Sequence, residues 1–134
     1  MKRLEVEVLR AQLGDFEDLG PYERVLTPEE TARANGYKLL EPRRVFILAR
    51  GLLRLELARR MRCQPGEIEF DLRPSGKPDV RRRGADRPDW RFSVSHTGPH
   101  AAIAFCRGTD VGLDIEGLDR TVDPLAIAKR YFTP

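Results

Sequence analysis

The chain has 134 residues, with 24 Lys and Arg against 21 Asp and Glu and a net charge of +3. This length suits one domain that buries roughly two-thirds of its unfolded surface, and it is short for a two-domain enzyme. The small charge excess, with acids interspersed among the bases, argues against a nucleic-acid-binding protein. No window approaches about 18 apolar residues, so we expect a cytoplasmic protein without a membrane segment.

The first half of the chain is expected to contain one strand and two helices. Apolar and charged residues alternate from Leu4 to Val8, which predicts a strand at a sheet edge or in a hairpin. Thr27 and Glu30 form a capping box that starts a helix running to about Leu40. Between Pro42 and Pro65 apolar residues recur at helical spacing, which predicts the longest amphipathic helix and the main packing element.

The second half is expected to be rich in strands. Ile68 to Leu72 alternates and predicts a strand, whereas Pro74 to Pro88 lacks periodicity and predicts a long loop. Within that loop, Arg81 to Arg83 is interpreted as a mobile, solvated run, with attraction of an anion as the alternative. The remaining predicted elements are three strands over 90–95, 101–106 and 111–115 and a helix over 124–132.

Two carboxylates close together form the first candidate site. Asp114 and Glu116 are two residues apart, so on a strand both project from one face. Hard oxygen ligands at this spacing suit Mg²⁺, which takes one or two protein carboxylates together with water and substrate phosphate. A solvated strand end with no ligand is the alternative, because the D-x-E pattern is common.

The second candidate is the turn that follows Ser93-Val94-Ser95-His96. Its backbone N–H groups and hydroxyls could wrap a phosphate. A catalytic Ser95–His96 pair is disfavoured, because adjacent residues on a strand point to opposite faces. A structural histidine remains the alternative. The third candidate is Ser75-Gly76-Lys77-Pro78, where a rigid turn offers a lysine to an anion, although many turns share this composition.

Taken in order, five segments resemble the N-terminal part of a 4′-phosphopantetheinyl transferase of the surfactin type. They are L-T-P-E-E at 26–30, E-P-R-R-V-F-I-L-A-R at 41–50, S-G-K-P at 75–78, F-S-V-S-H-T-G at 92–98 and V-G-L-D-I-E at 111–116. The resemblance implies an α+β half, with an antiparallel sheet packed against a long helix, as one of two pseudo-repeats. Residues 1–134 would then form a single αβ domain, the N-terminal half of the transferase.

This resemblance also implies an activity and its residues. The reaction would be Mg²⁺-dependent transfer of 4′-phosphopantetheine from coenzyme A to a serine of an acyl or peptidyl carrier protein. Asp114 and Glu116 match the metal ligands, and with His96 they are the expected catalytic residues. The expected coenzyme-binding residues are Arg73, Ser75, Gly76, Lys77 and Pro78 on the adenosine side, with Ser95, His96 and Asp114 toward the phosphates.

The chain departs from the family pattern in two places. Leu40 and Glu41 stand where relatives often carry a base, so the 3′-phosphate could be bound instead by Arg33, Arg43, Arg44 or Arg50. A third family block, of the W-x-x-K-E-x-x-x-K kind, does not occur. We therefore expect the chain to be inactive until the missing C-terminal half, or self-association through the exposed half-interface, completes the site. A non-catalytic module that binds coenzyme A or a nucleotide is the alternative function.

Overall fold

The computed structural model describes residues 5–74, 76–84 and 88–108. Its helices and strands follow one another in the order β1 (Val6–Gln12), α1 (Gly20–Glu23), α2 (Pro28–Asn35), α3 (Leu40–Met61), β2 (Ile68–Leu72), β3 (Pro78–Arg82), β4 (Trp90–Thr97) and β5 (His100–Arg107), with short 3-10 turns at Leu13–Asp15 and Pro65–Glu67. None of the described helices is both long enough and apolar enough to cross a membrane.

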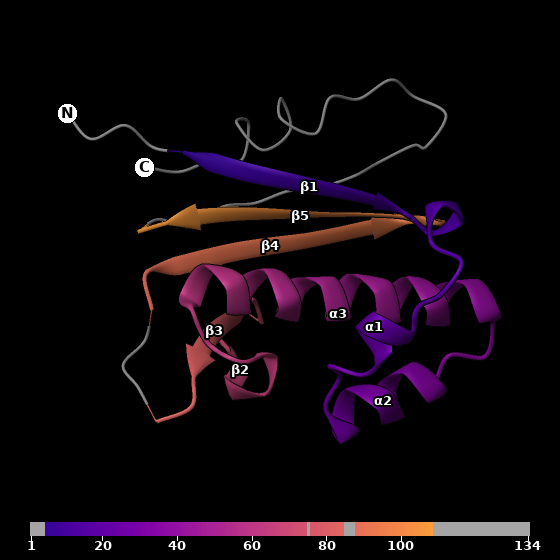
Figure 1. The fold of residues 1–134 in the computed structure, drawn as a ribbon, viewed down its shortest axis with the longest axis horizontal. Helices are drawn as coiled ribbons and strands as arrows, with labels where there is room; N and C mark the ends of the chain where they lie inside the picture. Colours follow the sequence, from indigo (N-terminus) through magenta and orange to yellow (C-terminus); the bar gives the residue numbers. More distant parts are fainter. Residues whose placement is uncertain (1–4, 75, 85–87, 109–134) are drawn as a thin grey trace.

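Two antiparallel sheets flank the long helix. One has the strand order β1-β5-β4, and the other is the β2-β3 hairpin. Figure 1 shows α3 running beneath the three-stranded sheet, with α1 and α2 near its N-terminal part and the hairpin near its C-terminal part. The predicted α+β fold, an antiparallel sheet packed on a long helix, is thus confirmed.

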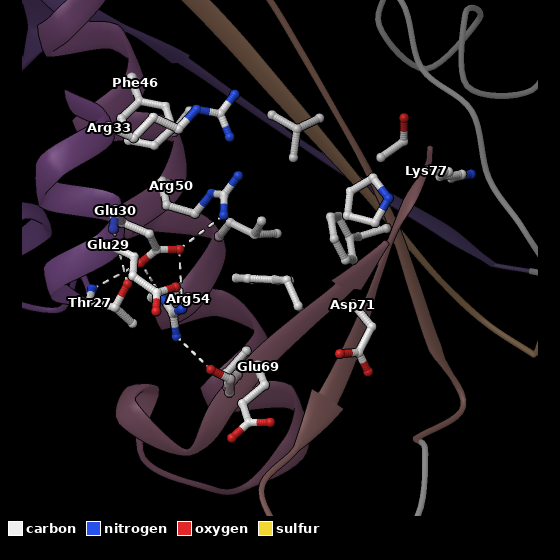
Figure 2. Close-up of a pocket in the computed structure, with 18 of the residues that line it drawn as sticks. Thr27, Glu29, Glu30, Arg33, Phe46, Arg50, Arg54, Glu69, Asp71 and Lys77 are labelled. Atoms are coloured by element: carbon white, nitrogen blue, oxygen red, sulfur yellow. Dashed lines mark hydrogen bonds and ion pairs between the residues drawn. The ribbon is translucent and has the colours of Figure 1, made fainter. Parts of the chain in front are cut away.

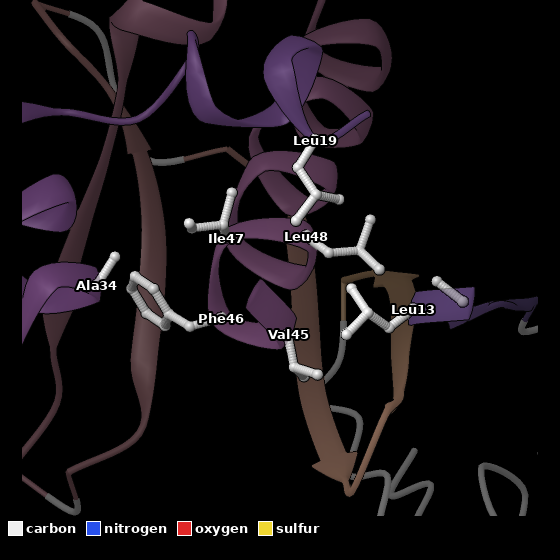
Figure 3. Packing of buried hydrophobic residues seen from close by; sticks show 8 residues of the cluster. Leu13, Leu19, Ala34, Val45, Phe46, Ile47 and Leu48 are labelled. Atoms are coloured by element: carbon white, nitrogen blue, oxygen red, sulfur yellow. The ribbon is translucent and has the colours of Figure 1, made fainter. Parts of the chain in front are cut away.

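The core consists of two clusters along α3, one at its N-terminal turns and one at its C-terminal turns. Its N-terminal turns pack on α2 and the segment after β1, with Leu48 fully buried (Figure 3). Its C-terminal turns pack Leu53 and Leu57 on the two sheets, where Ile103 and Phe105 of β5 are also fully buried. Both core clusters contain buried residues of α3, so this helix is the main packing element, as the sequence predicted.

Strand β4 separates its side chains into two faces. Phe92 and Val94 pack in the cluster that contains Leu57 of α3. Side chains alternate along a strand, so His96 shares their face and Ser95 lies on the other. This alternation places His96, and not Ser95, on the side of α3.

The predicted loop over Pro74 to Pro88 is wrong in its centre, where residues 78–82 form β3. The register pairs Val80 with Phe70 and Arg81 with Glu69. Val80 is 2% exposed. A single buried apolar residue next to several arginines does not produce an alternating pattern that can be detected in the sequence. The strand is stabilised by its pairing with β2, which the local sequence does not reveal.

The arginines of β3 are also more ordered than expected. Arg81 forms ion pairs with Glu69 at 2.7 Å and with Asp71 at 3.1 Å. Arg82 is 3.5 Å from Glu67, and Arg83 is 3.0 Å from Glu69. The basic run is therefore one side of an ion-pair ladder along the hairpin, rather than a mobile segment.

Helix boundaries differ from the predictions around the α2–α3 turn. The helix expected to reach Leu40 ends at Asn35, where the N–H of Gly36 donates to the carbonyl of Ala32. The long helix begins at Leu40 and includes Pro42 in its first turn. Proline is tolerated there because the N–H groups of a first turn have no partner within the helix.

Near the two ends of the chain, the predicted elements can be compared with the structure only where residues are described. Among the residues that the structure describes, strand β1 lies at the end of the order β1-β5-β4, as expected of an edge strand, and it extends to Gln12, beyond the alternation of Leu4, Val6 and Val8. Leu4, the predicted strand over 111–115 and the predicted helix over 124–132 lie outside the described residues.

Candidate functional site

A groove of about 1410 Å³ opens between α2, α3, the β2-β3 hairpin and β4. Figure 2 shows Arg33, Phe46 and Arg50 on the helical side and Lys77 across from them. The wall combines apolar and aromatic side chains with charged ones. The bases and the histidine that line it are Arg33, Arg50, Arg54, Lys77, Arg83 and His96, and the acids are Glu29, Glu30, Glu69 and Asp71.

Four of the predicted binding residues meet at this groove. Gly76 and Lys77 line it from the turn between β2 and β3, Pro78 lines it from the start of β3, and His96 lines it from near the end of β4. Gly76 has a φ of 89°, a left-handed conformation that glycine adopts without strain. The two segments are about twenty residues apart in sequence, and the fold brings both to one wall of the same groove.

The other predicted residues are placed differently. Arg73 makes a two-pronged ion pair with the buried Asp79, at 2.7 and 2.6 Å, and does not line the groove. Ser95 is half-buried on the opposite face of β4 from His96. Ser75, Asp114 and Glu116 lie outside the described residues.

Arg50 presents its guanidinium to the groove between two aromatic rings. Its Cζ lies 5.5 Å from the ring centre of Phe46 and 5.0 Å from that of Phe70. Its Nη1 donates to Glu30 Oε2 at 2.9 Å, and its side chain is 23% exposed. The Cζ of Arg33 lies 5.0 Å from the ring centre of Phe46. Both arginines therefore stack on the aromatic wall and direct positive charge into the groove.

Beneath Arg50 lies a buried ion pair between Glu30 and Arg54. Arg54 donates through Nε to Glu30 Oε1 at 2.6 Å and through Nη2 to Oε2 at 3.1 Å. Its Nη1 donates to the carbonyls of Pro65 and Ile68, at 3.0 and 2.7 Å. The Arg54 side chain is only 4% exposed. This arginine thus ties α3 to α2 and to the start of β2.

Glu30 has a second role at the start of α2. The N–H of Thr27 donates to Glu30 Oε1 at 3.0 Å, and the N–H of Glu30 donates to Thr27 Oγ1 at 3.1 Å, which confirms the predicted capping box. Burial alone would raise the pKa of Glu30, but hydrogen bonds from Arg54, Thr27 and Arg50 outweigh it and lower that pKa. Glu30 is therefore a carboxylate in the folded protein.

Sequence reasoning recognised Glu30 only as a capping residue. Its ion pairs with Arg50 and Arg54 span 20 and 24 residues, beyond any local pattern. One signal was present in the sequence: Arg54 interrupts the apolar positions of α3 between Leu53 and Leu57. An arginine at such a position requires a buried partner of opposite charge.

Arg43 and Arg44 do not line this groove. Both line a smaller hollow of about 370 Å³ between α1, α2 and α3, and Arg43 Nη2 donates to Asn35 Oδ1 at 2.7 Å. Arg33 and Arg50, by contrast, line the larger groove. Of the four arginines considered for the 3′-phosphate, two share a cavity with Lys77 and His96.

The described part of the chain has no cluster of three or more His, Cys, Asp or Glu side chains placed to hold a metal ion. The predicted Mg²⁺ ligands, Asp114 and Glu116, lie outside that part.

Comparison with known proteins finds one matching family model and several similar proteins. Residues 17–107 match the family model described as 4′-phosphopantetheinyl transferase, N-terminal. HetI of Nostoc, a 4′-phosphopantetheinyl transferase, is 37% identical over 81% of this chain and 46% of its own length. A Synechocystis protein assigned the same activity is 33% identical over 84% of this chain and 45% of its own length. Sfp of Bacillus subtilis, also a 4′-phosphopantetheinyl transferase, is 29% identical over 81% and 45%. The chain thus spans about half the length of these curated relatives.

Proposed function

The chain belongs to the 4′-phosphopantetheinyl transferase family, and from this membership we propose that its groove binds coenzyme A. The complete protein would transfer the 4′-phosphopantetheine group to a serine of an acyl or peptidyl carrier protein. The observation that carries the proposal is the meeting of Lys77, His96, Arg33 and Arg50 around one groove with aromatic walls. Coenzyme A combines a purine with several phosphates, which suits such a mixture of rings and cations.

We assign the 3′-phosphate to Arg33 and Arg50. These are the two of the four candidate arginines that line the groove, and a guanidinium binds a phosphate through paired N–H donors. Lys77 would act as a point charge on the opposite wall, and His96 would donate a hydrogen bond to a phosphate oxygen. Gly76 and Pro78 would shape the turn along the adenosine.

Asp114 and Glu116 would hold Mg²⁺. A bound Mg²⁺ neutralises charge on the oxygens of the pyrophosphate as the phosphoryl group is transferred. The residues of the groove would contribute binding and orientation, because phosphoryl transfer needs little covalent chemistry from the protein. Arg33, Arg50 and Lys77 would hold the coenzyme so that its pyrophosphate meets the carboxylate pair.

The share of its relatives' length that this chain covers bears on the activity. Since the chain spans about half of its curated relatives, we propose that transfer requires the segment that corresponds to their second half. Binding of coenzyme A by the groove alone, without transfer, is the second candidate function. It is favoured by one observation, that the proposed phosphate-binding bases all belong to the described αβ unit.

Calorimetric titration of coenzyme A into Lys77→Ala tests the groove. The variant is expected to bind about tenfold more weakly than the unmodified protein, since one charge-assisted contact to phosphate is lost. Lys38→Ala is the matched control, because Lys38 is exposed on the α2–α3 turn and does not line the groove. Equal weakening by both variants would mean a diffuse charge effect and would refute this binding site.

A further inference from the structure

Among the residues that the structure describes, one hydrogen bond and two aromatic rings hold the guanidinium of Arg50. Within the described residues, its hydrogen-bond partner is Glu30, through Nη1 and Oε2 at 2.9 Å. The rings of Phe46 and Phe70 flank the group, which leaves the remaining N–H donors available to a ligand in the groove. The orientation of Arg50 therefore depends on one carboxylate and two rings.

That carboxylate is itself held firmly. Glu30 accepts two hydrogen bonds from the buried Arg54 and one from the N–H of Thr27. Its side chain is 9% exposed, and Arg54 is anchored in turn on the carbonyls of Pro65 and Ile68. Because each partner is fixed by another element of the fold, Glu30 is a rigid support for Arg50.

The charges in this cluster do not cancel. Glu30 carries one negative charge and is shared by two guanidinium groups, so the cluster keeps a net positive charge at the groove. A long arginine side chain loses conformational freedom when it binds an anion, and an anchored side chain has already lost part of it. Glu30 thus orients Arg50 without neutralising the site.

We propose that Glu30 is a positioning residue, which holds Arg50 in the orientation that recognises the 3′-phosphate of coenzyme A. Glu30 itself does not contact the coenzyme; it sets the preference for coenzyme A over dephospho-coenzyme A, which lacks that phosphate. The inference rests on the proposed function and assigns one source of its specificity.

This role is measured by the ratio of two dissociation constants, for dephospho-coenzyme A and for coenzyme A. Both are determined by calorimetry on the full-length protein, by which we mean this chain together with the segment that corresponds to the second half of its relatives. Glu30→Gln is expected to lower the ratio about tenfold, a coupling typical of residues in one ion-pair network. A purely structural role would weaken both ligands equally and leave the ratio unchanged. Glu29→Gln is the matched control: it removes the same charge from the same groove, at a residue exposed to solvent, and should preserve the ratio.

A double-mutant cycle shows whether Glu30 acts through Arg50. Arg50→Gln should lower the ratio at least as far as Glu30→Gln, and adding Glu30→Gln to it should lower the ratio no further. A further decrease in the double variant would show that Glu30 acts by another route and would overturn the proposal.

A variant of Glu30 alone leaves the buried Arg54 with its two carbonyl acceptors but without a partner of opposite charge, and can prevent folding. The paired change Glu30→Gln with Arg54→Met removes both buried charges at similar volume, which proteins often tolerate. It should lower the ratio as Glu30→Gln does, and an unchanged ratio would overturn the proposal. If the unmodified protein binds neither ligand, the proposed function fails as well; if it prefers coenzyme A and every Glu30 variant keeps that preference, only the role of Glu30 fails.

Discussion

Replacing Arg54 with alanine is expected to lower the free energy of unfolding by about 3–5 kcal/mol, the range for breaking a buried ion pair from one side. The change would leave the carboxylate of Glu30 buried with a weaker set of partners. It would also remove the donors to the carbonyls of Pro65 and Ile68, which join α3 to β2. Three elements would lose a common contact.

Urea denaturation, followed by circular dichroism, measures the effect of Arg54→Ala. The control is Arg59→Ala, on the same helix, where the ion pair with Glu56 at 3.0 Å involves a side chain that is 67% exposed. Exposed pairs contribute about 0–1 kcal/mol, so this control should remain close to the unmodified protein. Similar losses in the two variants would contradict a special role for the buried pair.

Gly51→Ala is expected to destabilise the protein by about 1–3 kcal/mol, the usual cost of overpacking a core. Glycine inside a helix normally costs stability relative to alanine, so the opposite sign is informative. A Cβ atom at Gly51 would lie 2.5 Å from both the Cβ and the carbonyl oxygen of Tyr22, and 2.7 Å from its Cα. These are mainly backbone atoms, so α1 would have to move away from α3.

Thermal unfolding measures the effect of Gly51→Ala. Gly14→Ala is a suitable control, because a Cβ built there meets no atom of the described chain within 4 Å. We expect Gly14→Ala to leave the melting temperature nearly unchanged. A Gly51→Ala protein as stable as the unmodified one would show that α1 is not packed directly on α3.

The sequence was sufficient where local patterns determine the structure. The long helix, the capping box of Thr27 and Glu30, and the strands at β2, β4 and β5 all follow from periodicity or from end signals a few residues apart. Strand β3 was missed because Val80 is its one fully buried apolar residue, and its pairing with Phe70 depends on the neighbouring strand. Helix α2 ends at Asn35 and Gly36, residue types that favour a helix end, and not at Leu40.

The site was predictable only in part, for a related reason. Lys77 and His96 stand in recognisable motifs, and both line the groove. The distinction of Arg33 and Arg50 from Arg43 and Arg44 depends on which cavity each one lines, and hence on the packing of α2 against α3. Long-range packing of this kind leaves no trace in the spacing of residues.

Transfer itself is the most direct test of the central proposal. The full-length protein is incubated with coenzyme A, Mg²⁺ and an apo carrier protein, and the carrier is weighed by mass spectrometry. We expect the carrier to gain one phosphopantetheine group with the unmodified protein, and to gain none with Asp114→Asn. The matched control is Asp89→Asn, at an exposed position that does not line the groove, which should transfer normally. An unmodified carrier after incubation with the full-length protein, or undiminished transfer by Asp114→Asn, would contradict the account.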